Sequence, residues 1–267
     1  MQTVRIDQTD LEVSRLGFGT ASLHHLPRAR SRLRLLEAAL GAGITHFDTS
    51  PYYGYGLAEK DLGRFMRARR STVTIATKVG LFPPGPTPLG AAGVWARKAL
   101  GKAVRSLAAP RADWTIAAAE RSLHQSLSRL GTEYLDILFL HEPQDPGLVP
   151  ADDFVAWLET RRDAGVIRAW GVSGESRSYS AWLTAGHRIL NVVQAHDTLD
   201  GREADDILAS GRPLQFTYGY LGAALRSGAA TVAGDVVQGA LERNRTGAVI
   251  VSTRRAERIA ELAEAAA

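Results

Sequence analysis

The sequence predicts one α/β domain, residues 1–267, folded as a (β/α)8 TIM barrel with an N-terminal β-hairpin. Short apolar runs alternate eight times with helical patterns, which is typical of βα units around a parallel sheet. The length of 267 residues suits a barrel that typically has ~250. Chemically capable side chains also end three of the apolar runs, and catalytic residues of such barrels lie at the C-terminal ends of strands.

The strands are predicted in chain order from short apolar runs bounded by turn-forming residues. TVRID and LEVSR flank Gln8-Thr9-Asp10 and predict the leading hairpin. The eight barrel strands are expected at 16–20, 44–48, 73–79, 135–141, 167–173, 192–196, 213–217 and 247–251.

Helical patterns fill the intervals between these strands. In 152–164, Phe154, Val155 and Leu158 are spaced to form one buried face, and the acidic Asp152 and Asp153 favour its N-terminus through the helix dipole. The helices are expected at 30–42, 58–69, 116–130, 152–164, 178–186, 203–210, 231–244 and 254–266.

A long excursion, residues 80–115, follows the third strand. Four prolines mark its start, and 94–107 has the pattern of a short basic amphipathic helix. A lid over the barrel mouth, a partner surface and a membrane-surface contact are three open interpretations of this helix.

An open doubly wound sheet is the alternative fold. It calls for a Gly-x-Gly-x-x-Gly turn after the first strand. Gly17-Phe18-Gly19-Thr20-Ala21-Ser22 lacks the third glycine, so the barrel is favoured.

Composition excludes several function classes. The chain has no cysteine, hence no disulfide or thiolate metal site, and its histidines lack metal-ligand spacing. The net charge is +4, but the arginines are dispersed and accompany no nucleic-acid-binding motif. No apolar run reaches the ~18 residues of a membrane span, and the N-terminus lacks signal-peptide character. We expect a cytoplasmic protein that binds neither nucleic acid nor membrane.

Four residues at the predicted barrel mouth suit the reduction of a carbonyl group. Asp48, Lys78 and His141 end apolar runs, and Tyr53 follows Asp48 in a turn. Lys78 can stabilise phenolate and so lower the pKa of Tyr53 toward that of a useful general acid, while Asp48 keeps Lys78 charged. His141 can hydrogen-bond a carbonyl oxygen. None of these residues can supply a hydride, so a cofactor must.

The end of the chain predicts a phosphate site. The last strand leads into Ser252, Thr253, Arg254, Arg255 and, one helical turn later, Arg258. Helix N-termini bind anions, and barrels often bind phosphate after strands seven and eight.

The chain resembles the aldo-keto reductases over nearly its whole length. The resemblance rests on FDTSPYYGYGLAEKDLG, the TK strand end, LDILFLHEP, GVIRAWGVSG and VIVSTRRAERIAEL. It implies that Asp48, Tyr53, Lys78 and His141 are a catalytic tetrad with Tyr53 as general acid.

The resemblance also implies a set of cofactor contacts. Gly19 and Thr20 would line the cofactor path, and Ser173 and Gln194 would bind the nicotinamide carboxamide. Phe216 would stack on the nicotinamide ring, where the family often has Tyr. Ser252 and Arg254 belong to the expected phosphate site, and Thr253 with Arg258 match positions that contact the adenosine 2′-phosphate, which implies NADPH.

Several features depart from the family pattern: Ser252 replaces a lysine common before the phosphate-binding Ser/Thr, and the segment 218–230 is short. Gly174 stands where the family usually has Asn, and the C-terminal tail that often shapes the substrate pocket is missing. We therefore expect Trp95 and Trp114 of the excursion to form a pocket wall, and bulky apolar aldehydes or ketones to be the small-molecule substrates. A nucleotide-binding regulatory or partner-binding barrel with slow turnover is the alternative function.

Overall fold

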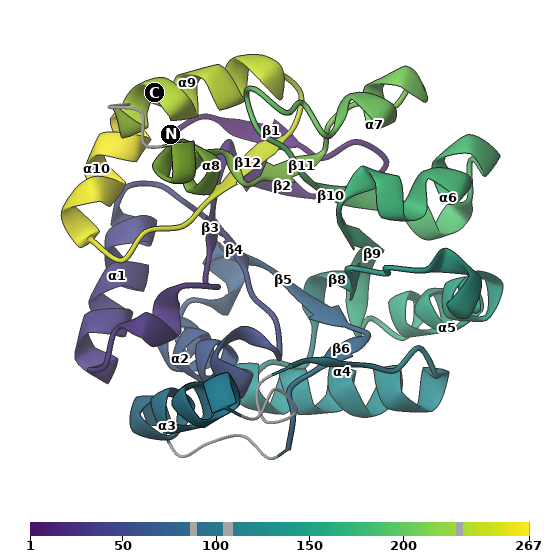
Figure 1. Cartoon of the computed structure of the whole chain (residues 1–267), viewed down its shortest axis with the longest axis horizontal. Helices are drawn as coiled ribbons and strands as arrows, with labels where there is room; N and C mark the ends of the chain where they lie inside the picture. Colours follow the sequence, from purple (N-terminus) through teal and green to yellow (C-terminus); the bar gives the residue numbers. More distant parts are fainter. Residues whose placement is uncertain (86–89, 104–108, 228–231, 267) are drawn as a thin grey trace.

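Eight parallel strands close into a barrel in the computed structural model, which describes residues 1–85, 90–103, 109–227 and 232–266. The order around the barrel is β10-β11-β12-β3-β4-β5-β8-β9, with helices outside it (Figure 1). The predicted fold class is therefore confirmed. The barrel strands are β3 (Leu16–Gly19), β4 (His46–Asp48), β5 (Thr74–Val79), β8 (Leu135–His141), β9 (Ile167–Gly174), β10 (Val192–His196), β11 (Phe216–Tyr218) and β12 (Ala248–Val251).

A helix follows each barrel strand, as expected from the alternation in the sequence. These helices are α1 (Ala29–Gly41), α2 (Leu57–Met66), α4 (Ile116–Leu130), α5 (Ala151–Asp163), α6 (Ser180–Ala185), α7 (Asp205–Ala209), α9 (Ala233–Arg243) and α10 (Ala256–Glu264). Two others, α3 (Gly90–Ala103) and α8 (Tyr220–Ser227), lie within loops at the strand ends. Short 3-10 segments are η1 (Leu23–His25), η2 (Tyr53–Gly56), η3 (Arg70–Thr72), η5 (Pro146–Leu148), η6 (Ser176–Tyr179) and η7 (Arg188–Leu190).

Helix α4 shows how local sequence sets these boundaries. The Thr115 hydroxyl accepts a hydrogen bond from the Ala118 amide at 3.2 Å, which caps the first turn. Gly131 ends the helix in the left-handed region, with φ +65°, where glycine lacks the steric penalty of other residues. Between these caps Leu123 and Leu130 are buried in the main core.

The hairpin closes the N-terminal end of the barrel. Strands β1 (Thr3–Arg5) and β2 (Glu12–Ser14) pair antiparallel, with Val4 opposite Val13. Ile6, Leu11 and Val13 are fully buried and cluster with Phe139 and other residues of the barrel interior. The opposite end, where the strands finish, is left for the candidate site.

Strand β11 differs from its predicted position. It covers Phe216–Tyr218 instead of 213–217. The Gln215 side-chain oxygen accepts a hydrogen bond from the Val193 amide of β10 at 2.8 Å. A side chain therefore satisfies this amide, which a backbone carbonyl would satisfy if β11 began earlier. The strand also ends one residue later than predicted, on Tyr218.

The two ends of the excursion after β5 are paired with each other, and the excursion covers one side of the barrel mouth. Strands β6 (Leu81–Phe82) and β7 (Arg111–Ala112) pair antiparallel and join its two ends. Helix α3 packs on η1 and η2, and the Arg97 guanidinium lies 5.1 Å from the centre of the Tyr55 ring. The helix predicted at 94–107 is thus found at Gly90–Ala103; positions 104–107 fall outside the described residues.

The described residues hold neither a membrane-spanning helix nor a cluster of metal-ligating side chains. None of the helices among them has both the length and the apolar character needed to span a bilayer. Nor do three or more His, Asp or Glu side chains in that part of the chain gather into a possible metal site.

Candidate active site

The barrel brings the four predicted catalytic residues together at its C-terminal end. Asp48 and His141 are the last residues of β4 and β8, Lys78 is the penultimate residue of β5, and Tyr53 opens η2. The parallel register aligns Gly19 with Asp48 and His141 with Ser173. Because parallel strands finish at the same end of a barrel, residues distant in sequence converge there.

Lys78 is the centre of this group. Its ammonium donates to Asp48 Oδ2 at 2.5 Å, to the Thr49 carbonyl at 2.9 Å and to the Tyr53 hydroxyl at 3.4 Å. The side chain is 1% exposed. An ammonium has three donors, so every one of them has an acceptor in the fold.

Burial shifts the pKa values of both Lys78 and Tyr53. Burial lowers the pKa of Lys78, and the Asp48 carboxylate opposes that shift. Burial, together with the Asp48 charge, raises the pKa of Tyr53 well above its usual value. The sequence-based expectation of a lowered Tyr53 pKa is therefore not met in this structure, because desolvation of phenolate dominates. Tyr53 carries its proton at neutral pH.

His141 is held as a neutral imidazole. Burial and the nearby Lys78 charge lower its pKa well below the ordinary value. Its Nδ1 lies 3.2 Å from the Ser50 hydroxyl, and the Ser50 oxygen already accepts from the Tyr52 amide at 3.2 Å. A Ser50 proton directed at Nδ1 would leave the His141 proton on Nε2, where it can act as a donor.

Ser173 and Gln194 extend the same hydrogen-bond network. The Ser173 hydroxyl donates to Gln194 Oε1 at 2.5 Å, and Gln194 Nε2 donates to Asp48 Oδ2 at 3.1 Å. Both residues are buried at the base of a cavity. One carboxylate oxygen of Asp48 therefore orients both Lys78 and this amide pair.

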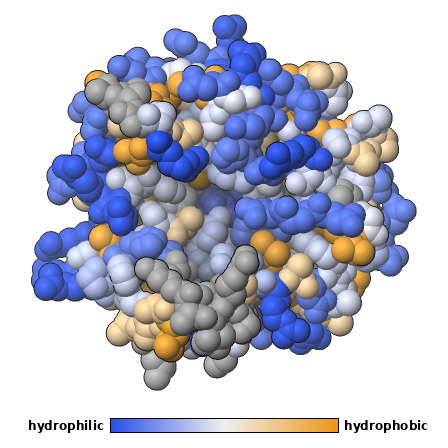
Figure 2. Space-filling model, viewed as in Figure 1, coloured by the Kyte–Doolittle hydropathy of each residue, from blue (hydrophilic) through white to orange (hydrophobic). Residues whose placement is uncertain are grey.

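Two cavities meet at the barrel mouth, and Figure 2 shows this face hollowed near its centre. The first, about 360 Å³, is lined by Asp48, Tyr53, His141, Ser173 and Gln194, among others. The second, about 460 Å³, lies at the start of α10. Leu221, Leu225 and Ser252 line both, so the two cavities are neighbours, and together they are called the channel.

The predicted phosphate residues lie at the far end of this channel. Thr253, Arg254, Arg255 and Arg258 all line the second cavity. The Thr253 hydroxyl accepts from the Arg255 amide at 3.2 Å and orders the turn into α10. Arg258 Nε is 3.9 Å from Glu261, a loose contact that leaves its guanidinium free to bind an anion.

Two predicted cofactor residues lie elsewhere. Thr20 is fully buried, and its hydroxyl donates to the Asp48 carbonyl at 3.0 Å, so it supports the backbone below the cavity. Phe216 lies inside the barrel, stacked on His46 with ring centres 4.8 Å apart. A ring held there does not reach the cavity, which corrects the predicted nicotinamide contact.

The cavity also exposes residues that the sequence analysis did not select. Tyr218, Glu142, His196 and Arg226 line it. Tyr218 was missed because β11 was predicted to end before it. Glu142 directly follows His141 and has φ +50°, an uncommon backbone conformation for a non-glycine residue, but a single sequence gives no sign of that conformation.

The predicted pocket wall in the excursion is not found at this cavity. Trp114 packs edge-on against Phe154, with ring centres 6.5 Å apart, and Trp95 lies in α3 beside His25, at 6.0 Å. Neither tryptophan lines the catalytic cavity. Polar side chains line this cavity together with Tyr53 and Tyr218, instead of the two tryptophans expected from the sequence.

Comparison with known proteins identifies the family. The model of the aldo/keto reductase family matches residues 15–209. The chain belongs to the aldo/keto reductase family. D-threo-aldose 1-dehydrogenase from a Pseudomonas species is 36% identical over 175 residues, 61% of this chain and 50% of that protein. Aldo-keto reductase YhdN from Bacillus subtilis is 31% identical over 182 residues, 66% of this chain and 48% of that protein. The matched part thus spans about half the length of these relatives.

Solved structures agree with the fold. An aldo-keto reductase from Klebsiella pneumoniae in complex with NADPH superposes with a TM-score of 0.72 at 23% identity. The superposition covers 99% of this chain and 89% of the Klebsiella chain. At this level of identity, the match supports the (β/α)8 architecture.

Proposed function

We propose that this protein reduces aldehydes or ketones to alcohols, with NADPH as the hydride donor and Tyr53 as the general acid. One observation supports the proposal above all: Lys78 donates to both Tyr53 and Asp48 beneath a cavity that adjoins the arginine-lined cavity at the start of α10. Membership of the aldo/keto reductase family is consistent with it.

The channel fits a phosphorylated dinucleotide. Ser173 and Gln194 offer an amide-binding pair at one end, and Arg254, Arg255 and Arg258 offer positive charge at the other. We assign the ring-stacking role to Tyr218, the aromatic side chain from β11 that faces the cavity. Bound there, NADPH would supply the hydride.

The residues of this chain supply the proton. His141 Nε2 can donate to the substrate carbonyl oxygen and set its direction. Tyr53 gives its proton to that oxygen as negative charge develops. Lys78, 3.4 Å from the Tyr53 hydroxyl, stabilises the phenolate left behind, and Asp48 keeps Lys78 charged and in place.

Tyr53→Phe tests the acid directly. We expect the variant to lose turnover by about 10²–10⁴-fold, the usual contribution of general acid catalysis, while NADPH still binds. The assay follows NADPH consumption with a panel of aldehydes. Tyr52→Phe, a neighbour that does not line the catalytic cavity, is the control and should behave like the wild type.

Two other results would contradict the proposed activity. Near-wild-type kcat in Tyr53→Phe would remove Tyr53 from the mechanism. NADPH binding without consumption across the whole panel would instead support a nucleotide-binding barrel with slow turnover.

We expect the 2′-phosphate of NADPH to bind at the start of α10. Arg258→Ala should weaken NADPH binding about tenfold through loss of a charge-assisted hydrogen bond, and should leave NADH affinity nearly unchanged. Dissociation constants from nucleotide titrations of the two proteins provide the test. Equal affinity of the wild type for NADPH and NADH would contradict this part of the proposal.

A further inference from the structure

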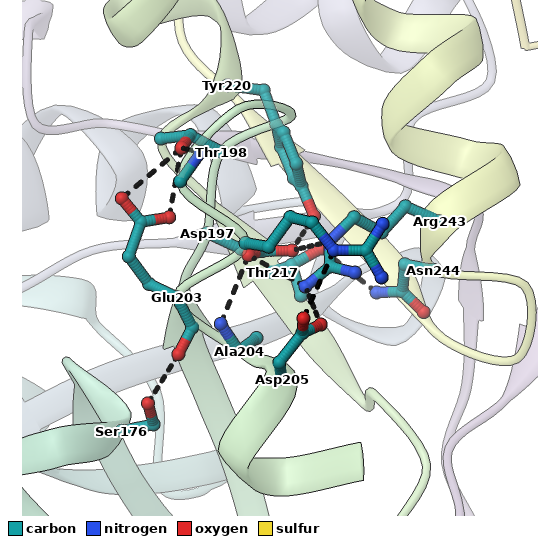
Figure 3. Close-up of polar contacts among 12 residues, drawn as sticks. Ser176, Asp197, Thr198, Glu203, Ala204, Asp205, Thr217, Tyr220, Arg243 and Asn244 are labelled. Carbon is teal, nitrogen blue, oxygen red and sulfur yellow. Dashed lines mark hydrogen bonds and ion pairs between the residues drawn. The ribbon is translucent and has the colours of Figure 1, made fainter. Parts of the chain in front are cut away.

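A hydrogen-bonded cluster centred on one buried carboxylate lies just beyond the end of β10, outside the two cavities. Asp197 is fully buried and accepts four hydrogen bonds (Figure 3). Its donors are Tyr220 Oη at 2.6 Å, Arg243 Nε at 2.5 Å, Arg243 Nη2 at 3.1 Å and the Ala204 amide at 3.1 Å. Both carboxylate oxygens are used, as a buried charge requires.

The cluster joins four elements at one point. Asp197 follows β10, and Ala204 precedes α7. Arg243 ends α9 and also donates to Asp205 of α7 at 2.8 Å. Tyr220 is the first residue of α8, and its side chain points from α8 down to Asp197 (Figure 3).

The turn before Tyr220 fits tightly against the same strand end. Gly219 has φ +117°, and a Cβ there would approach His196 Nε2 to 2.7 Å and the Asp197 carbonyl to 2.8 Å. Only glycine fits this position. The start of α8 is therefore held both by this close contact and by the Tyr220 hydroxyl.

Helix α8 forms the wall shared by the two cavities. Leu221 and Leu225 line both of them, Gly222 and Arg226 line the catalytic cavity, and Ala224 lines the cavity at α10. Tyr220 and Asp197 line neither. Their hydrogen bond can therefore affect a ligand only indirectly, and α8, which begins at Tyr220, is the element through which we expect it to act.

We propose that Tyr220 is a positioning residue for the dinucleotide: its hydrogen bond to Asp197 holds α8 where it shapes the channel. The inference rests on the proposed function. Leu225, on the cavity side of this helix, is 74% exposed, so its burial holds α8 only weakly and the anchor at the first residue of the helix matters more. Without the Tyr220–Asp197 hydrogen bond, the bound dinucleotide must order α8, and the free-energy cost of that ordering weakens the affinity of the protein for the dinucleotide.

The experiment compares Tyr220→Phe with Tyr179→Phe. Both remove one hydroxyl from a buried tyrosine, but Tyr179 Oη has no hydrogen-bond partner among the described residues. We expect Tyr220→Phe to raise the NADPH dissociation constant about tenfold and to keep kcat at saturating NADPH within twofold of the wild type. Tyr179→Phe should match the wild type in both quantities.

A second readout needs neither cofactor nor turnover. Trypsin cleavage after Arg226, an exposed residue of α8, should be several-fold faster in Tyr220→Phe than in the wild type or in Tyr179→Phe. Cleavage elsewhere in the chain serves as the internal reference, because a general loss of stability would accelerate every site.

The outcomes separate the two proposals. Unchanged NADPH affinity and unchanged cleavage after Arg226 in Tyr220→Phe would overturn the anchoring role, as would equal effects in Tyr179→Phe. Failure of the wild type to bind NADPH would refute the proposed function, and the cleavage comparison would then still decide whether Tyr220 holds α8.

Discussion

At the scale of single residues, the candidate site depends on how a buried lysine keeps its charge. Burial lowers the Lys78 pKa, and the Asp48 carboxylate at 2.5 Å opposes this. Asp48 is therefore more than a structural partner. Its negative charge favours the ammonium form of Lys78, which the proposed mechanism requires.

Asp48→Asn should make turnover depend on pH in a specific direction. Without the carboxylate the Lys78 pKa falls further, so neutral amine accumulates as pH rises. We expect kcat about 10²-fold below the wild type at pH 8, recovering as pH falls toward 6 and the ammonium returns. The wild type should change little over this range, because Tyr53 keeps its proton and His141 stays neutral. Parallel pH profiles for the two proteins would contradict this role of Asp48.

Glu142 adds a negative charge to the cavity wall beside His141. Burial raises its pKa, so the test is set at pH 8, on the alkaline side, to favour the carboxylate. Glu142→Gln should improve kcat/KM for 4-carboxybenzaldehyde about tenfold relative to uncharged benzaldehyde, because like charges repel across a poorly solvated cavity. An unchanged ratio of the two substrates would show that Glu142 does not select substrates by charge.

At the scale of elements, the sequence predicted the strands better than their ends. The apolar run Leu135–His141 has a clear start and end in the sequence, and strand β8 covers the same residues as predicted. Strand β11 was not, because the side chain of Gln215 takes part in pairing with β10 and a period-two pattern alone does not mark the start of a ladder. That small displacement placed Tyr218 instead of Phe216 at the cavity, so an error in a strand end became an error in the predicted site.

The excursion after β5 shows a contact that no pattern in the sequence reveals. Trp114 was expected to face a substrate, yet it packs over Gly80 at the first turn of the excursion. A Cβ on Gly80 would lie 2.0 Å from Trp114 Cζ3, and Gly80 has φ +98°. Backbone conformation and packing both require glycine there.

Gly80→Ala should therefore lower the free energy of unfolding by about 2–3 kcal/mol, through steric overlap and backbone strain together. Urea unfolding measures the change. Gly41→Ala in α1 is the matched control, since nothing lies within 4 Å of its Cβ position; it should be neutral or slightly stabilising. Equal effects of the two substitutions would mean that the Trp114 contact does not constrain the fold.

At the scale of the whole molecule, the barrel interior holds a histidine that makes stability depend on pH. His46 is fully buried, with Nδ1 2.9 Å from the Thr74 hydroxyl and its ring stacked on Phe216. Its Nε2 has no hydrogen-bond partner among the described residues. Burial, with the Lys78 charge, lowers its pKa to about 3.

The sign of the effect follows from proton binding. Below pH 6.5 the unfolded chain protonates His46 while the folded barrel does not, so the unfolded state binds more protons and stability falls as pH falls. Each pH unit costs about 1.4 kcal/mol, or on the order of 4 kcal/mol between pH 6.5 and 3.5. His46→Gln cannot titrate, so its free energy of unfolding, measured in urea at several pH values, should fall less steeply than that of the wild type. His124→Gln removes a surface histidine whose side chain is 69% exposed and should keep the wild-type slope. If His46→Gln retained that slope too, acid sensitivity would have to come from other groups, and the neutral histidine in the barrel interior would have no share in it.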